Sequence, residues 1–237
     1  MALAPSEPSV KGSGVSLAAI VLAAGASSRM GRPKALLEWR GQSFLRRVIA
    51  LAETSSCAPI IAVEGAIRLP ASELGSAVRI VHTTWSNGQL SSLQAGLTAV
   101  LDRIDHTTNN KHTAPGRAQT TIESLNTVSI TGVMVLAIDR PRILPSTCQA
   151  LAAAHRREPK AIWQPATETR RGHPIIYPSL LFAELLALPS TEGPRDWLRS
   201  PRIDAHRRYL QVTDAGIFEN FDRPGDLTGL RNSSESG

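Results

Sequence analysis

Short apolar runs alternate along this chain with longer stretches in which apolar residues recur at helical spacing. Four apolar runs are typical of buried strands, and they span Leu17–Ala23, Pro59–Val63, Val78–Val81 and Gly132–Ile138. Helical spacing predicts four helices, over Ser43–Thr54, Leu90–Ile104, Pro145–Arg157 and Pro178–Leu188. This alternation favours an α/β fold with a mostly parallel sheet covered on both faces. In such sheets, ligands bind at the carboxyl ends of the strands.

Polar segments interrupt this pattern in three places. Residues 105–127 contain few apolar residues and no clear period, so we expect a polar surface insertion there, or a short irregular helix within it. The first 16 residues lack the apolar centre of a signal peptide. We therefore expect flexible tails at residues 1–16 and 231–237, around a single domain that spans residues 17–230.

The composition narrows the classes of partner. Aromatic residues make up only 4% of the 237 residues, so the core must be built mainly from Ala, Val, Ile and Leu. A formal net charge of +6 suits an anionic partner such as nucleic acid, an acidic membrane or a phosphorylated small molecule. Four arginine pairs are expected mostly on solvated faces, at Arg46–Arg47, Arg156–Arg157, Arg170–Arg171 and Arg207–Arg208.

Cysteine spacing and hydropathy exclude further classes. The two cysteines, Cys57 and Cys148, lie outside any CxxC or CxxH pattern, so neither a structural zinc site nor a disulfide framework is expected. No apolar run approaches the roughly 18 residues of a membrane-spanning helix. The scarcity of aromatics and the lack of a recognised motif disfavour a nucleic-acid-binding module. These features predict a reduced, cytoplasmic protein with no membrane and no nucleic-acid partner.

The most informative stretch is VLAAGASSRMGRPK, which spans Val21–Lys34. It matches neither the Walker pattern nor the dinucleotide fingerprint. Small residues at Ala23–Gly25 nevertheless let backbone amides approach a ligand closely, and such amides can form an anion-binding nest. Arg29 and Lys34 add formal charge suited to a triphosphate. The alternative is a tight strand-to-helix loop whose basic residues face solvent.

Five blocks in order carry a resemblance to a known family. LAAGASSRMGRPK resembles the L-A-A-G-x-S-x-R-M-G-x-x-K signature of the MobA-like NTP transferases, and is most similar to their molybdenum cofactor cytidylyltransferase branch. Four later blocks are similar to further family segments, and they are GQLSSLQAGL at Gly88–Leu97, AIDRPRI at Ala137–Ile143, GHPIIY at Gly172–Tyr177 and FDRPGDL at Phe221–Leu227. The resemblance implies a Rossmann-like three-layer nucleotidyltransferase fold.

The resemblance also implies a reaction. A nucleoside monophosphate would move from an NTP to the phosphate of molybdopterin, with release of pyrophosphate and with Mg²⁺ as cofactor. L-A-A-G, rather than the L-A-G-G of the guanylyl branch, favours CTP over GTP. A GTP-dependent guanylyltransferase, a related enzyme with a sugar or alcohol phosphate acceptor, and a non-catalytic nucleotide-binding protein are the alternatives. A molybdoenzyme or its chaperone is a further candidate partner.

Site residues follow from the matched blocks. The resemblance implies catalytic roles for Lys34, Arg29 and Asp139, and magnesium binding by Asp139 and Asp222. The residues that it places around the nucleotide are Leu22, Ala23, Ala24, Gly25, Arg29, Lys34, Gly88, Ser91 and Ser92. Because strand ends converge at one edge of a parallel sheet, we expect the two aspartates to face one Mg²⁺ position.

The resemblance implies that His173 and Arg195 help to bind the acceptor, molybdopterin. Arg195 lies in Ser190–Arg195, where the branch carries Gly-Asp-x-Gly-Ala-Arg, and the chain retains the second glycine and the arginine of that segment. The D-x-P block has Arg140 where the family often has an uncharged residue. Arg140 either contacts substrate phosphate or points away from it.

Several of these residues also have structural explanations. Asp139 and His173 are residue types common in turns. Ser91, Ser92 and Asp222 stand where they would cap a helix.

Overall fold

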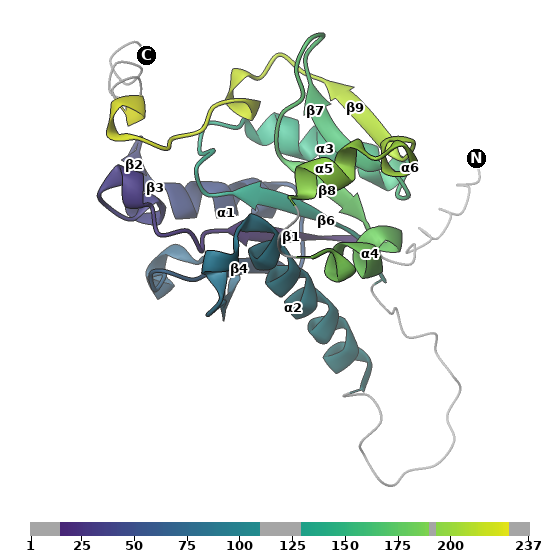
Figure 1. Ribbon diagram of the computed structural model, residues 1–237, viewed down its shortest axis with the longest axis horizontal. Helices are drawn as coiled ribbons and strands as arrows, with labels where there is room; N and C mark the ends of the chain where they lie inside the picture. The colour runs from purple at the N-terminus through teal and green to yellow at the C-terminus, as the bar shows by residue number, and fades with distance from the viewer. Residues whose placement is uncertain (1–14, 110–128, 190–192, 228–237) are drawn as a thin grey trace, which may run out of the picture.

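The computed structural model describes residues 15–109, 129–189 and 193–227, and its centre is a seven-stranded sheet in the order β5-β4-β1-β6-β8-β7-β9 (Figure 1). β8 runs antiparallel to β6 and β7, and the other neighbours pair in parallel. The sheet strands are β1 Val15–Leu22, β4 Ile60–Glu64, β5 Val78–Val81, β6 Ser129–Ala137, β7 Ile162–Ala166, β8 Ile175–Pro178 and β9 Arg207–Gln211. A two-stranded hairpin, β2 Glu38–Trp39 with β3 Gln42–Ser43, lies outside the sheet. The predicted α/β fold with a mostly parallel sheet is confirmed.

Helices cover both faces of the sheet. They are α1 Phe44–Thr54, α2 Gln89–Asn109, α3 Pro145–Arg157, α4 Phe182–Ala187, α5 Pro194–Arg199 and α6 Pro201–Asp204. α1 and α3 pack on one face, while α2, α4 and α5 pack on the other (Figure 1). The three layers expected from the resemblance are therefore present. No described helix is long and apolar enough to cross a membrane.

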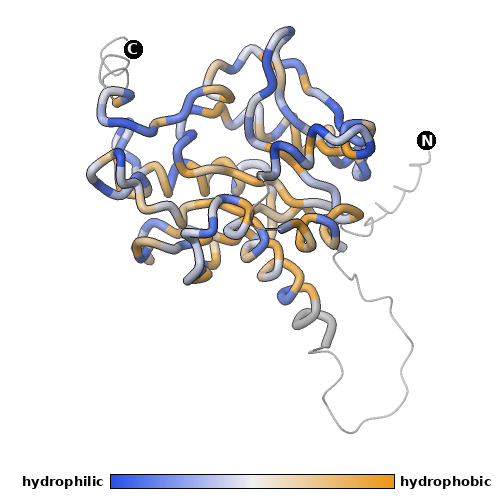
Figure 2. The backbone as a smooth tube through the Cα atoms, in the orientation of Figure 1, coloured by the Kyte–Doolittle hydropathy of each residue, from blue (hydrophilic) through white to orange (hydrophobic). Residues whose placement is uncertain are grey.

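β1 shows how the sequence builds this sandwich. Its side chains alternate between the two apolar cores, with Leu17, Ala19 and Val21 in one and Ala18, Ile20 and Leu22 in the other. This two-residue period is that of a strand buried on both faces. Apolar residues concentrate along the central strands, while polar residues gather at the periphery (Figure 2). α2 approaches β1 closely because residue 96 is glycine, where a Cβ would lie 2.6 Å from Ile20 Cγ2.

A third apolar cluster joins the segment that follows β1 to the C-terminal segment. It contains Met30, Leu37, Trp39, Phe44 and Phe221. The rings of Phe44 and Phe221 meet edge to face, with centroids 5.7 Å apart. Aromatic pairs in this arrangement are worth roughly 0.5–1.5 kcal/mol beyond the area that they bury. The cluster holds the C-terminal segment against the loop that follows β1.

Several sequence-based boundaries were wrong. β1 begins at Val15, inside the expected N-terminal tail. α2 continues to Asn109, so the first residues of the expected insertion are helical; residues 110–127 of that insertion lie outside the described residues. Three strands, β7, β8 and β9, were not predicted. The sequences of β7 and β9, IWQPA and RRYLQ, carry polar residues, and β8, IIYP, is apolar but only four residues long. The polar side chain of Gln164 can be buried in β7 because its hydrogen-bonding groups have partners. Its amide nitrogen donates to Gly172 O at 2.8 Å, and its amide oxygen accepts from Arg207 Nη2 at 2.8 Å.

The fold buries a histidine that sets a pH limit on stability. His155 in α3 is fully buried, and its Nε2 lies 3.0 Å from Thr131 Oγ1. Burial, with a smaller contribution from Arg156, lowers its pKa to about 4. The unfolded chain therefore binds a proton near pH 6.5 that the folded protein does not bind until about pH 4. The free energy of unfolding should rise with pH across this window and level off above it.

We expect urea unfolding of the wild-type protein to show this rise between pH 4.5 and pH 6.5. His155→Gln should reduce the slope by up to one proton, which corresponds to about 1.4 kcal/mol per pH unit. The slope arises because the imidazole of His155 is buried in its neutral form. An unchanged slope in a folded His155→Gln variant would contradict this explanation.

Candidate active site

A cleft of about 380 Å³ opens at the carboxyl ends of β1 and β6. Its lining comes from the loop after β1, the start of α2 and the end of β6, and comprises Leu22, Ala24, Gly25, Ser27, Lys34, Trp85, Ser86, Gly88, Gln89, Ser92, Ala137, Ile138 and Asp139. Main-chain bonds draw the two strand ends together, since Ile138 N donates to Leu22 O at 3.1 Å. The cleft therefore occupies the position where parallel sheets bind ligands.

The loop after β1 is a tightly constrained turn. Gly31 has φ 70°, in the left-handed region that favours glycine, and Ser27 has φ 53°. Ser27 Oγ accepts from Lys34 N at 3.0 Å, and Ser27 O accepts from Met30 N at 2.9 Å. These bonds fix the backbone of Lys34 at the mouth of the cleft.

Lys34 is held within the cleft rather than facing solvent. Its ammonium forms an ion pair with Asp222, and its side chain is only 14% exposed. The second oxygen of Asp222 accepts from Asn220 Nδ2 at 2.6 Å. Arg29 differs, because it is exposed on the short 3₁₀ helix Ser28–Met30 and does not line the cleft. The alternative of a solvent-facing basic residue therefore describes Arg29 and not Lys34.

Asp139 follows β6 and lines the same cleft as Lys34. Its Oδ1 is buried and has no hydrogen-bond partner among the described residues. Burial raises the pKa of this carboxyl, although Arg140 and Lys34 oppose the rise, and Asp222 is near enough to raise it further. Phe221 N donates to Asp139 O at 3.0 Å, which brings the residue before Asp222 against Asp139.

The carboxylate of Asp222 is not a helix cap. Asp226, inside the 3₁₀ helix Pro224–Leu227, instead closes the turn before that helix, because its Oδ2 accepts from the backbone N–H groups of Asp222 and Arg223 at 2.8 Å each. Nothing in the described chain gathers three or more His, Cys, Asp or Glu side chains as a closed metal cage. The unpaired oxygen of Asp139 beside Asp222 instead fits Mg²⁺, which uses one or two carboxylates and completes its shell with water and substrate phosphates.

The start of α2 contributes unevenly to the cleft. Ser92 lines it, whereas Ser91 lies 3.0 Å from His82 Nε2 and donates to Gly88 O at 2.8 Å. Neither hydroxyl accepts a backbone N–H of the helix, so neither serine is an N-cap. Of the small residues after β1, Ala24 and Gly25 line the cleft, while Ala23 is buried and donates its N–H to Val63 O.

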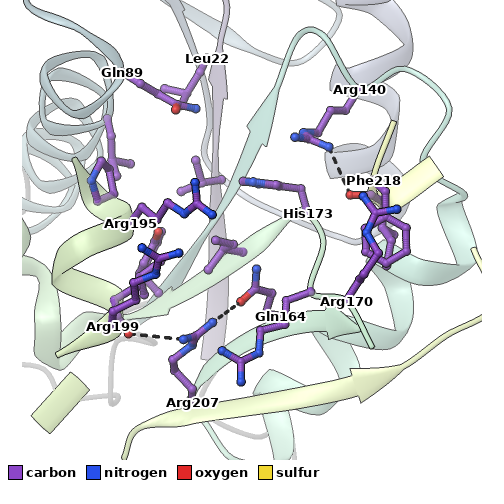
Figure 3. Close-up of a pocket in the computed structure, with 18 of the residues that line it drawn as sticks. Leu22, Gln89, Arg140, Gln164, Arg170, His173, Arg195, Arg199, Arg207 and Phe218 are labelled. Atoms are coloured by element: carbon purple, nitrogen blue, oxygen red, sulfur yellow. Dashed lines mark hydrogen bonds between the residues drawn. The ribbon is translucent and has the colours of Figure 1, made fainter. Parts of the chain in front are cut away.

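A second and larger cavity of about 700 Å³ adjoins the cleft, and Leu22 and Gln89 line both (Figure 3). Its charge is one-sided, because the described residues of its lining include six arginines and no aspartate or glutamate. The arginines are Arg140, Arg170, Arg171, Arg195, Arg199 and Arg207. Such a wall attracts anions strongly, since cavities lined by one sign of charge focus the electrostatic field.

Aromatic rings and main-chain groups hold several of these arginines in place. Arg170 lies over the Phe218 ring at 4.2 Å, and Arg171 lies over the Tyr209 ring at 4.5 Å. Arg140 donates to Ile217 O at 3.2 Å, which anchors it in the cavity wall beside Asp139. The expectation that arginine pairs sit mostly on solvated faces was wrong for Arg207, which is buried. Arg170 and Arg171 are exposed as expected, although both also line the cavity.

Both residues expected on the acceptor side line this second cavity. His173 and Arg195 point toward one another across it (Figure 3). Burial, with a contribution from Arg140, lowers the pKa of His173 to about 4, so its imidazole is neutral near pH 7. His173 can therefore donate or accept a hydrogen bond there but adds no charge. Arg195 is exposed to the cavity and makes no ion pair with another described residue.

Sequence reasoning missed part of the site. Trp85, Ser86 and Gln89 line the cleft, yet only Gln89 falls within a block that carried the resemblance. Arg199 and Gln164 belong to the larger cavity without any local signal in the sequence. The arginines near Arg195 were the one feature of the sequence that could have indicated this cavity. They form a cluster only in the folded protein, where α5, β7 and β9 come together.

Comparison with known proteins shows which sequences and folds this chain is similar to. Residues 19–208 match the MobA-like NTP transferase domain. A probable molybdenum cofactor guanylyltransferase of Deinococcus radiodurans is 28% identical over 92% of this chain and 96% of its own. Nicotine blue oxidoreductase of Paenarthrobacter nicotinovorans is 28% identical over 76% of this chain and 80% of its own. The crystal structure of Rv0371c from Mycobacterium tuberculosis superposes with a TM-score of 0.65 at 22% identity, covering 94% of this chain and 100% of that one.

Proposed function

Because this chain belongs to the MobA-like NTP transferase family and is therefore a nucleotidyltransferase, we propose that it transfers CMP from CTP to the phosphate of a molybdopterin-type acceptor and releases pyrophosphate. The 380 Å³ cleft would hold the nucleotide, and the 700 Å³ cavity would hold the acceptor.

The observation that carries this proposal is the junction of the two cavities. They meet at Leu22 and Gln89, with Lys34 and Asp139 in the first and six arginines in the second. A reaction between two phosphate compounds needs both of them bound at once, with the attacking oxygen near the α-phosphorus. One metal-binding cleft and one cationic cavity side by side suit that requirement better than they suit a single ligand.

The chain's own residues supply position and charge. The Ala24–Gly25 backbone and the ammonium of Lys34 would bind the triphosphate, and the acceptor phosphate would enter from the arginine wall. Asp139 and Asp222 would hold Mg²⁺, which when bound neutralises phosphate charge and orients the α-phosphate. Rv0371c has also been crystallised with manganese, and this neighbour (TM-score 0.56, 21% identity, 92% and 98% coverage) supports a divalent cation at such a fold.

Positioning explains the catalysis without a protein nucleophile. The acceptor oxygen attacks the α-phosphorus, the bond to pyrophosphate breaks, and negative charge grows on the departing group. Lys34 is the one positively charged side chain among the described residues of the cleft lining, so it would stabilise that charge. His173 is uncharged near pH 7, so its role would be to position the acceptor rather than to neutralise phosphate.

The choice of base rests on the wall formed by Trp85–Gln89 and Ser92. No carboxylate lies among the described residues of that wall. Guanine presents two neighbouring donor groups that a carboxylate accepts well, whereas cytosine presents one donor and two acceptors. The amide of Gln89 and the hydroxyls of Ser86 and Ser92 match cytosine. The guanylyltransferase relative favours GTP instead, and this is the second candidate function.

We therefore expect CTP to raise the melting temperature more than GTP at equal concentration, with Mg²⁺ present throughout. A ligand that binds only the folded protein stabilises it by RT ln(1 + [L]/Kd), so the difference reports relative affinity. A thermal-shift panel with CTP, GTP, ATP and UTP measures it. A larger shift with GTP would replace the cytidylyl assignment by the guanylyl one.

The full reaction is tested by pyrophosphate release. Protein, Mg²⁺, CTP and molybdopterin should release pyrophosphate, and omission of either substrate should abolish the release. A parallel reaction with a sugar phosphate in place of molybdopterin identifies the acceptor class. Release with the sugar phosphate alone would refute the molybdopterin assignment and retain the nucleotidyltransferase.

A further inference from the structure

Trp85 occupies an unusual position for an aromatic residue in this chain. The chain has four tryptophans, and Trp85 is the one aromatic side chain among the described residues that line the 380 Å³ cleft. It begins the 3₁₀ helix Trp85–Asn87 and is half-buried. One part of the indole packs on the α2 side of the apolar core, and another faces the cleft.

The backbone around Trp85 is shaped to seat the ring. A Cβ at Gly65 would lie 2.6 Å from Trp85 Cγ and 2.7 Å from Ala24 O, so no larger residue fits there without displacing the indole or the loop. The loop is fixed in turn, because Ala66 N donates to Ala24 O at 3.0 Å. Gly88 N donates to Trp85 O at 3.1 Å and holds the turn that carries the tryptophan.

Phosphates and base should bind at opposite ends of the cleft. Lys34 and Asp139 mark the phosphate end by charge. Trp85, Ser86 and Gln89 come from the other wall, which carries no formal charge among its described residues. A planar heterocycle bound there would meet the indole as the one π-face of the cleft lining, and neutral hydroxyl and amide groups at its edges.

We propose that Trp85 is the stacking platform for the nucleotide base, with Gly65 as the position that seats it. This inference rests on the proposed function, because it names the group that binds the base of the same NTP. Stacking of a base on an aromatic side chain changes affinity by on the order of 10- to 100-fold when the aromatic is removed. Trp85 therefore sets affinity for the nucleoside, while Lys34 and the metal act on the triphosphate.

The test separates base from phosphate. Titration calorimetry is run with CTP, GTP and inorganic tripolyphosphate in the presence of Mg²⁺, on wild type, Trp85→Phe and Trp85→Ala. Trp85→Ala should weaken binding of the preferred nucleotide by about 10- to 100-fold and leave tripolyphosphate within about 2-fold of wild type. Trp85→Phe retains a π-face and should stay within about 5-fold. Equal losses for nucleotide and tripolyphosphate, or no loss for either, would overturn the role of Trp85.

Intrinsic fluorescence provides a second measurement that does not depend on the alanine variant folding. Binding of the nucleotide should quench wild-type emission, and Trp85→Phe should abolish the quench. Trp163→Phe is the matched control, since Trp163 donates to Glu158 O at 3.2 Å beside α3 and lies outside the cleft lining. A quench that persists in Trp85→Phe refutes the platform. A wild-type protein that binds no nucleotide at all refutes the proposed function as well.

Discussion

Asp139→Asn is expected to lower the rate of nucleotidyl transfer by on the order of 10²- to 10³-fold while the fold remains intact. Under the proposed function the buried Oδ1 of Asp139, which has no hydrogen-bond partner among the described residues, would bind Mg²⁺, and an amide is a poorer ligand for that hard cation. Because burial raises the pKa of this carboxyl, its ionised form destabilises the folded protein at neutral pH. The variant should therefore melt at the same temperature or higher. Turnover across a Mg²⁺ titration and thermal unfolding measure the two effects.

Two further aspartates sharpen this experiment. Asp222→Asn should also slow transfer and raise the Mg²⁺ requirement, because Asp222 lies beside Asp139 and holds Lys34. Asp226→Asn is the matched control, since asparagine caps the turn about as well as aspartate and Asp226 does not line the cleft. Wild-type turnover by Asp139→Asn at every Mg²⁺ concentration would remove Asp139 from the metal site.

Lys34→Ala should lower the rate of transfer by on the order of 10²-fold or more. The ammonium of Lys34 is the one positive charge among the described residues of the cleft lining. The ion pair with Asp222 and the turn at Ser27 fix it there. Nucleotide affinity should fall as well, because the charge aimed at the triphosphate is lost in both ground and transition states. Steady-state kinetics with varied NTP separate the loss in kcat from the rise in KM.

A neighbouring arginine provides the control for Lys34. Arg32 carries the same charge in the same loop but is exposed and outside the cleft lining, so Arg32→Ala should stay within about 3-fold of wild type. Lys34 and Asp222 form one ion pair, so the effects of Lys34→Ala and Asp222→Asn should be non-additive in a double-mutant cycle. Equal losses from Lys34→Ala and Arg32→Ala would indicate general electrostatics instead of a positioned contact.

The sequence predicted the parts of the site that depend on local order. Asp139 follows the most apolar strand, and the small residues after β1 announce a loop that approaches a ligand, so both were placed at the sheet edge in advance. The arginine cavity was not predictable in this way. Arg140, Arg171, Arg199 and Arg207 come from four separate segments, and only the packing of α5 and β9 against β7 and β8 brings them together.

Two strands in the second half of the sheet, β7 and β9, were missed for a related reason. Polarity in β7 and β9 masks strands whose polar groups are satisfied by one another, as in the Arg207–Gln164 pair. A hydrophobic pattern detects a buried strand only when the buried side chains are apolar. Trp85 was likewise not predicted to line the cleft. An isolated aromatic residue three positions before a glycine is equally typical of a turn that packs on a core.

The edge-to-face contact between Phe44 and Phe221 has a consequence for the order in which the enzyme acquires activity during synthesis. Domains fold from the N-terminus as the chain leaves the ribosome, and the strands around β1 can pair long before residue 221 is made. The ion pair between Lys34 and Asp222 can form only after Phe221 docks beside Phe44 and carries Asp222 with it. A nascent or prematurely terminated chain would thus possess the loop after β1 without the carboxylate that pairs with Lys34. Under the proposed function, nucleotide turnover would therefore begin only after the C-terminal segment has been synthesised and has docked.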